Sequence, residues 1–88
     1  MARISQARLE EMQRVAAGNP EVRFPIIVTL GEGVQPEDIQ DPGFAVDHRL
    51  SGILTGAASA GAIFRLSALA DVLVEEDGEV RAIDESQL

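Results

Sequence analysis

The clearest pattern of apolar residues lies at residues 24–30, where the sequence FPIIVTL predicts a β-strand. β-Branched residues are frequent in this run, and apolar side chains fall on both alternating faces. Such a strand is typical of the centre of a sheet that is covered on one face and at least partly on the other. Pro25 is compatible with this prediction because it lies near the start of the strand.

A β-hairpin is predicted next, from residues 44–50 (FAVDHRL) and residues 53–57, with a turn at Ser51-Gly52. A regular alternation in the first strand would place four residues on one face: Phe44, Val46, His48 and Leu50. The second strand runs back beside the first, so the two are expected to be antiparallel neighbours.

The C-terminal part of the chain predicts a fourth strand at residues 72–76, followed by the turn signal Asp77-Gly78. Residues 79–83 fit a short edge strand that folds back after this turn. The last residues, 84–88, are expected to form a free tail.

Helical periodicity is found in two longer segments and one short one. Residues 3–17 predict a helix with a thin apolar stripe and Ser5 as its N-cap. Residues 60–70 predict a second helix with a broader apolar stripe, for which Ser59 is the N-cap. Residues 34–41 have room for about two turns of helix, or for a 3₁₀ turn.

The predicted order is an N-terminal helix followed by β-α-β-β-α-β. Two such β-α-β halves form the ferredoxin-like α+β fold, in which two helices cover one face of an antiparallel sheet. The other face is left for solvent or a partner. We therefore expect an N-terminal helix at residues 1–18, a ferredoxin-like domain at 19–84 and a tail at 85–88.

Charge narrows the range of partners. The 88 residues carry 15 acids and 7 bases, all of them Arg, for a net charge of −8. Because the bases are scattered, a nucleic-acid partner is not expected. Acids gather late in the chain, where Arg81 is the one base among Asp71, Glu75, Glu76, Asp77, Glu79, Asp84 and Glu85. These acids either form a solvated face or complement positive potential on a partner, such as helix N-termini.

The composition excludes sites that depend on cysteine, and it gives no sign of a membrane span or a signal peptide. The chain has no Cys, so neither a disulfide nor a thiolate site can form. No apolar run is long enough to span a membrane, and the N-terminus lacks the apolar core of a signal peptide. We expect a cytoplasmic protein that does not associate with membranes.

Candidate catalytic features are weak. The sequence TGAASAG at residues 55–61 is similar to a dinucleotide-binding turn, but its glycines are misplaced and a tight turn before a helix is the better interpretation. His48 is the single His, and alternation would point its neighbour Asp47 to the opposite face. The late acids lack the ligand spacing of a calcium loop. We therefore expect neither an enzyme nor a bound cofactor or metal.

Over about residues 24–84 the chain resembles the peptidase inhibitor I9 family, which comprises the propeptides of subtilisin-like proteases and free-standing inhibitors related to them. The segments that carry the resemblance are FPIIVTL with the turn GEG, the hairpin HRLSGILTGAAS, and the helix AIFRLSALADV followed by VLVEEDGEVRAI. The first helix is shorter than is usual in that family, and the N-terminal helix is additional. The resemblance implies a stand-alone inhibitor or folding helper for a subtilisin-like protease.

The resemblance also implies how such a protein binds. The open sheet face would pack on surface helices of the protease, and Glu75 and Asp77 are the nearest matches to the acids that cap those helices. The C-terminal residues would lie along the substrate cleft as an added strand: Ile83, Asp84, Glu85, Ser86, Gln87 and Leu88. Leu88 would occupy the first specificity pocket.

Two other functions remain open at this point. One is a homo-oligomeric assembly domain, in which residues 1–17 pack against a second copy and the open sheet face pairs symmetrically. The other is a regulatory domain that binds a small molecule or a metal, which is less favoured because no polar groups converge in the sequence.

Overall fold

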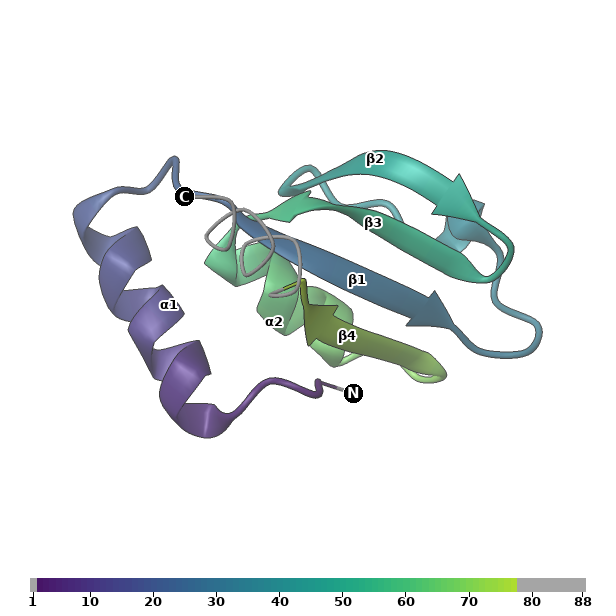
Figure 1. The fold of residues 1–88 in the computed structure, drawn as a ribbon, viewed down its shortest axis with the longest axis horizontal. Coiled ribbons are helices and arrows are strands. Elements are labelled where there is room, and N and C mark those ends of the chain that lie inside the picture. Colours follow the sequence, from purple (N-terminus) through teal and green to yellow (C-terminus); the bar gives the residue numbers. More distant parts are fainter. Residues whose placement is uncertain (1, 78–88) are drawn as a thin grey trace, which may run out of the picture.

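Figure 1 shows the computed structural model of the chain, which describes residues 2–77. Within these residues the chain forms an α+β fold with a four-stranded antiparallel sheet, two α-helices and one short 3₁₀ helix. The elements in chain order are α1 (Gln6–Gly18), β1 (Phe24–Leu30), η1 (Pro36–Asp38), β2 (Phe44–Leu50), β3 (Ile53–Ala58), α2 (Ala60–Ser67) and β4 (Val72–Glu76). The predicted α+β class is confirmed, whereas the edge strand predicted at residues 79–83 lies outside the described part.

The four strands lie in the order β2-β3-β1-β4, and every neighbouring pair is antiparallel. β1 is a central strand, as its two apolar faces predicted. Because β1 and β2 are both antiparallel to β3, they run parallel to each other on either side of it. β3 and β4 are related in the same way across β1. The connection that contains η1 joins the first of these parallel pairs, and α2 joins the second.

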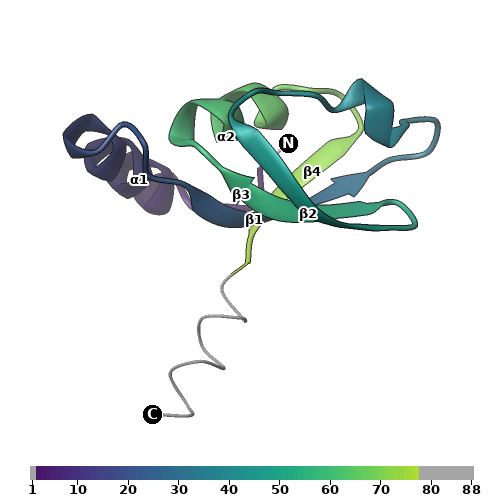
Figure 2. The ribbon, with the colours of Figure 1, turned by 90° about the horizontal axis from the view of Figure 1, so that it is seen from above.

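The core lies between the sheet and the helices on one of its faces (Figure 2). α2 begins after the predicted N-cap Ser59, whose Oγ accepts a hydrogen bond of 3.2 Å from the backbone N–H of Ala62. The largest fully buried side chains are Met12, Ile26, Val28, Leu54, Ile63 and Val74. They come from both helices and from three strands, so one apolar core holds the whole described fold together.

α2 is shorter than predicted, because it ends at Ser67 and not at residue 70. The chain then turns toward β4 through Asp71, which has a positive φ of 60°. The backbone N–H of Gly31 donates a hydrogen bond of 2.6 Å to the carbonyl oxygen of Asp71. A Cβ at Gly31 would lie only 2.7 Å from that oxygen, so the close approach of these two loops requires glycine. The tertiary contact therefore overrides the helical periodicity of residues 68–70.

The alternation predicted for β2 is wrong beyond Val46. A β-bulge at Asp47 shifts the pairing, so that Val46 is opposite Gly56 whereas His48 is opposite Thr55. His48 therefore faces the side opposite to Val46. Gly56 allows the strands to approach here, because a Cβ on it would lie 2.0 Å from the carbonyl oxygen of Ala45.

The connection between β1 and β2 contains a single 3₁₀ turn, η1, where the sequence allowed two turns of helix or a 3₁₀ turn. Pro36 occupies its first turn, and Ile39 after it is buried in the core. Because this turn is so short, α2 is the one α-helix that connects strands of the described sheet.

α1 begins after its predicted N-cap Ser5 and ends at Gly18. It lies beside α2, and its Met12 side chain is only 1% exposed (Figure 1). The residues before it also join the sheet, because Ala2 forms a parallel bridge with Val74 and the N–H of Arg3 donates to the Val74 carbonyl oxygen at 2.7 Å. The N-terminal segment therefore covers part of the outer edge of β4. Within residues 2–77, no helix has the length and apolar character needed to cross a membrane.

Candidate protein-binding face

The sheet face that points away from α2 is covered by neither α-helix (Figure 2). We call it the open face. Strand alternation fills it with small, β-branched and apolar residues, and one carboxylate lies at its β4 side. Its half-buried members are Ile27 and Thr29 from β1, Ile53, Thr55 and Ala57 from β3, and Leu73 and Glu75 from β4.

The strand register arranges the open face in cross-strand rows. Ile27 of β1 lies between Thr55 of β3 and Glu75 of β4. The next row along the strands places Thr29 between Ile53 and Leu73. Neighbours in such rows shield one another, which keeps each side chain half-buried although no helix covers the face. The result is a largely uncharged surface with an acid at one side.

The two acids that the sequence singled out lie at the end of β4. The Glu75 carboxylate is 32% exposed and lies 3.7 Å from a guanidinium nitrogen of Arg3, whose side chain is 74% exposed. Such an exposed pair contributes little stability and can be exchanged for another partner. The backbone N–H of Asp77 donates a hydrogen bond of 3.0 Å to the carbonyl oxygen of Pro25, which holds Asp77 beside the start of β1.

The structure places Glu75 on the open face and Asp77 directly after the last residue of the same strand. The other predicted binding residues lie outside the described part of the chain: Ile83, Asp84, Glu85, Ser86, Gln87 and Leu88. The proposed tail contact therefore stays a prediction.

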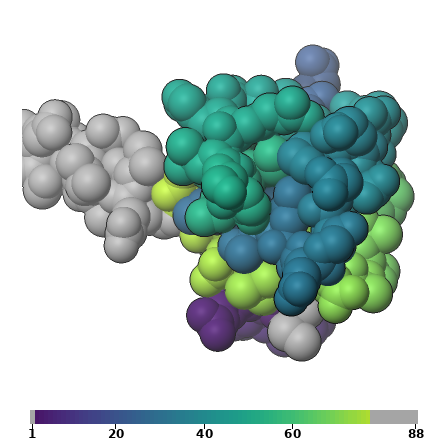
Figure 3. All heavy atoms as spheres, turned by 90° about the vertical axis from the view of Figure 1, so that its right-hand side faces the viewer, coloured from purple at the N-terminus to yellow at the C-terminus, as the bar shows by residue number. Residues whose placement is uncertain are grey.

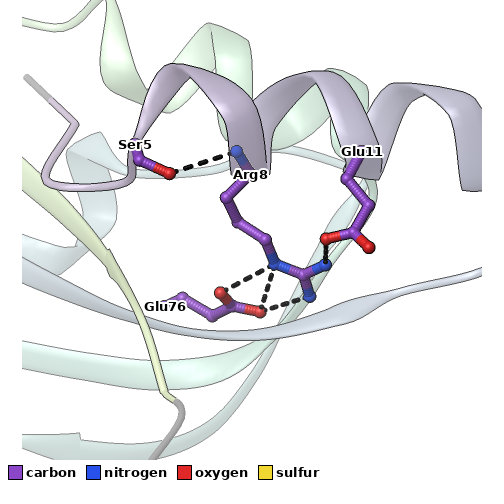
Figure 4. Close-up of polar contacts among 4 residues, drawn as sticks. All are labelled: Ser5, Arg8, Glu11 and Glu76. Atoms are coloured by element: carbon purple, nitrogen blue, oxygen red, sulfur yellow. Dashed lines mark hydrogen bonds and ion pairs between the residues drawn. The ribbon is translucent and has the colours of Figure 1, made fainter.

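A side-chain cluster that local sequence patterns did not indicate joins α1 to β4 (Figure 4). Arg8 Nε donates to both carboxylate oxygens of Glu76, at 2.9 and 3.1 Å, and Arg8 Nη2 donates to one of them at 2.6 Å. Its other terminal nitrogen donates to Glu11 at 2.6 Å, and the guanidinium carbon lies 5.6 Å from the centre of the Phe24 ring. Hydrogen bonding to Glu76 first, and then to Glu11, raises the pKa of Arg8.

This cluster separates the roles of two neighbouring acids. Glu76 is opposite Ile26 in the sheet and so faces the same side as α2, where it binds Arg8. Glu75 faces the open side. Of these two carboxylates, Glu75 is therefore the one that a partner on the open face would meet.

We expect Arg8→Met to lower the free energy of unfolding by about 2 kcal/mol, because the 16%-exposed Glu76 carboxylate would lose a forked, charge-assisted donor. Methionine keeps most of the apolar contact of the arginine stem. Arg14→Met on the exposed side of α1 is the matched control and should change stability by less than about 0.5 kcal/mol. Urea unfolding followed by circular dichroism measures both; equal losses in the two variants would show that the fork does not stabilise the fold.

A second forked ion pair joins the loop before β2 to α2. Arg65 donates from Nε and Nη2 to the two oxygens of Asp41, at 2.7 and 2.8 Å, and the backbone N–H of Gly43 donates to the same carboxylate at 2.9 Å. Hydrogen bonding to Arg65 is the main cause that lowers the pKa of Asp41 from 3.8 to about 2, and the Gly43 bond adds to it.

This depressed pKa predicts a specific loss of stability in acid. Asp41 stabilises the fold above its unfolded pKa of 3.8, and this contribution is lost as the pH falls toward its folded pKa of about 2. The difference in unfolding free energy between the wild type and Asp41→Asn should therefore be constant above about pH 5 and shrink between pH 4 and pH 2. Urea unfolding of both proteins across this range measures it. A difference that does not change with pH would contradict the ionic role of Asp41.

The remaining candidate chemistry has a structural explanation. Thr55–Ala58 belong to β3, and Gly56 is required there by the approach of β2, so the TGAASAG sequence does not form a glycine-rich loop. Among residues 2–77, no three or more His, Asp or Glu side chains are placed to hold a metal ion together. Comparison of the chain with protein-family models, with curated proteins and with solved structures gave no match.

Proposed function

We propose that the chain is a propeptide-like inhibitor or folding helper that binds a subtilisin-like serine protease through the open face and the C-terminal tail. The observation that carries the proposal is the open face itself, which is a largely uncharged sheet surface with Glu75 at its β4 side. A largely uncharged sheet face that no element of residues 2–77 covers is a candidate protein-binding site.

The proposal includes a ferredoxin-like fold in which the first helix is reduced to η1. The antiparallel strand order β2-β3-β1-β4 supports this assignment. The connection through η1 joins the parallel strands β1 and β2, and the connection through α2 joins the parallel strands β3 and β4. In this fold both connections lie on one face, which leaves the opposite face available over the whole width of the sheet.

The charges of the chain favour helices of the protease as the elements that contact the open face. The chain has a net charge of −8, and Glu75 is bound in the described structure only by the exposed pair with Arg3. Helix N-termini carry partial positive charge and unpaired N–H groups, both of which a carboxylate satisfies. Glu75 would accept these N–H groups in place of Arg3, and Asp77 would do so at the end of β4.

The tail is the second part of the proposed contact. The hydrogen bond from Asp77 to Pro25 holds the last described residue before the tail beside the start of β1. Residues 83–88 would then add a strand in the substrate cleft, where backbone hydrogen bonds supply affinity and Leu88 fills the specificity pocket.

Removal of residues 84–88 tests the proposed function. We expect the shortened chain to keep the unfolding free energy of the full chain and to lose binding to a subtilisin whose catalytic serine is replaced by alanine. Isothermal titration with this inactive protease separates binding from digestion. If the shortened and full chains bind equally well, the tail mechanism is wrong; if the full chain does not bind, the proposed function is wrong.

The alternative function, assembly through the N-terminal helix, receives no comparable support. Met12 on α1 is buried within the same chain, and Arg8 is bound to Glu76. Met12 and Arg8 are thus used within the chain, whereas Val15 on the same helix is 42% exposed, so assembly through α1 stays an untested alternative.

A further inference from the structure

The two edges of the sheet differ in how far they are covered. At the β4 edge, Ala2 and Arg3 pair with Val74 and so occupy part of the outer hydrogen-bonding groups. At the other edge, β2 pairs with β3 on one side and with no described strand on the other. β2 has seven residues, and the outer edge of such a strand is a template for pairing with another strand.

The side chains of β2 are unusually exposed for a strand of a small domain. Six of its seven residues, all except Phe44, are exposed. Two of them are large and apolar: Val46 is 42% exposed and Leu50 is 65% exposed. Burial of these two side chains against a partner would therefore be favourable.

A groove runs along the side of β2 that faces η1. It encloses about 830 Å³ between β2 and the η1 loop, and its walls include Pro36, Ile39, Phe44, Val46 and Leu54. Figure 3 views this end of the molecule, with the β2–β3 hairpin in teal beside the η1 loop in blue. Asp47 and Arg49 both line the groove, so they lie on the same side of β2.

The sequence of β2 is complementary to itself when read in the antiparallel direction. Around His48, an acid (Asp47) and a base (Arg49) lie at equal distances in sequence, and the apolar Val46 and Leu50 lie one position further out. A two-fold axis at His48 would place Asp47 of each copy opposite Arg49 of the other. Opposite charges in directly paired positions stabilise antiparallel strands, and an isologous contact forms each such pair twice.

We infer that β2 is the contact strand of a symmetric homodimer, in which it pairs antiparallel with β2 of a second copy about an axis at His48. The self-complementary charges select a second copy of this chain over an unrelated strand. Because of the bulge at Asp47, Val46 and Leu50 face opposite sides of the sheet, so they do not form such a pair and the two charge pairs carry the inference. The sheets of the two copies then form one continuous sheet.

Within residues 2–77, the ion pair that Arg49 makes does not prevent the new pairing. Arg49 makes a 3.9 Å ion pair with Glu37 of η1, but the two side chains are 61% and 70% exposed, so the pair is weak and exchangeable. The inference does not rest on the proposed protease-binding function, because Glu75 and Asp77 lie at the opposite edge of the sheet from β2. A dimer would therefore present two copies of that proposed site.

Charge reversal at β2 tests the inference. Sedimentation equilibrium from about 5 to about 500 μM should give a mass that rises from the 9.4 kDa of one chain toward twice that value. Asp47→Arg and Arg49→Asp each turn both cross-copy pairs into like-charge pairs, so each should weaken the dimer about tenfold. An equimolar mixture of the two variants restores opposite charges in both pairs and should form a heterodimer about as stable as the wild-type dimer.

The controls are Glu32→Arg and Arg14→Asp, which make the same charge changes at exposed positions away from β2 and should leave dimerisation unchanged. The mixing experiment also controls for folding, because two misfolded variants would not restore each other. If the wild type has the mass of one chain at every concentration, the inference is wrong. The bulge at Asp47 would then be a feature that protects the β2 edge from pairing. Variants that dimerise like the wild type, or that fail to associate when mixed, would overturn it as well.

Discussion

Replacement of Gly56 by alanine is expected to lower the free energy of unfolding by about 3 kcal/mol, one of the largest losses for any single methyl group in this fold. The added Cβ would lie 2.0 Å from the carbonyl oxygen of Ala45 and 2.9 Å from the Cα of Val46. Both contacts are with backbone atoms of β2, which cannot rotate away as a side chain would. β2 would have to move off β3 at the bulge.

The matched control is Gly18→Ala, because a Cβ at this helix-terminal glycine meets no atom within 4 Å. It should leave stability unchanged or raise it by about 0.5 kcal/mol through a smaller entropy of the unfolded chain. Urea unfolding of the two variants, followed by circular dichroism, compares them directly. A loss of less than about 1 kcal/mol in Gly56→Ala would show that β2 can relax around the new methyl group, and that glycine is not required at the bulge.

The second large effect is expected on binding. Thr55→Arg places a long cation in the central row of the open face, beside Ile27 and in the same row as Glu75. If the open face packs on protease helices, the arginine would both separate the surfaces and oppose the positive helix N-termini. We expect affinity for the inactive protease to fall at least about hundredfold.

Ala68→Arg is the control for this variant, because Ala68 is exposed at the end of α2 and α2 covers the other face of the sheet. It adds the same side chain and the same charge, and binding should be unchanged. Unfolding curves of both variants should match the wild type, since Thr55 is only half-buried. Equal affinity of Thr55→Arg and the wild type would exclude the open face as the contact surface.

Local sequence patterns predicted the strands well. β1 and β2 have the bounds that the apolar runs indicated, and the start of α2 follows from its N-cap Ser59. These features depend on neighbours within a few residues, so a single sequence contains the information. The placement of Glu75 on a strand face could also be predicted from alternation along β4.

Features that depend on distant residues could not be predicted. The bulge in β2 depends on the approach of Gly56, and the early end of α2 depends on the contact between Gly31 and Asp71. The fork between Arg8 and Glu76 joins residues 68 positions apart. Alternation along β4 separates the faces of Glu75 and Glu76, but the contact of Glu76 with Arg8 on α1 could not be predicted from the sequence.

A subtilisin progress curve with the purified chain at micromolar concentration tests the proposed binding to a subtilisin-like protease. We expect sustained inhibition of substrate turnover, and weaker inhibition when Leu88 is replaced by aspartate, because that change would place a charge in an apolar specificity pocket. Rapid digestion of the chain with no lag in substrate turnover would show that the chain does not inhibit the protease.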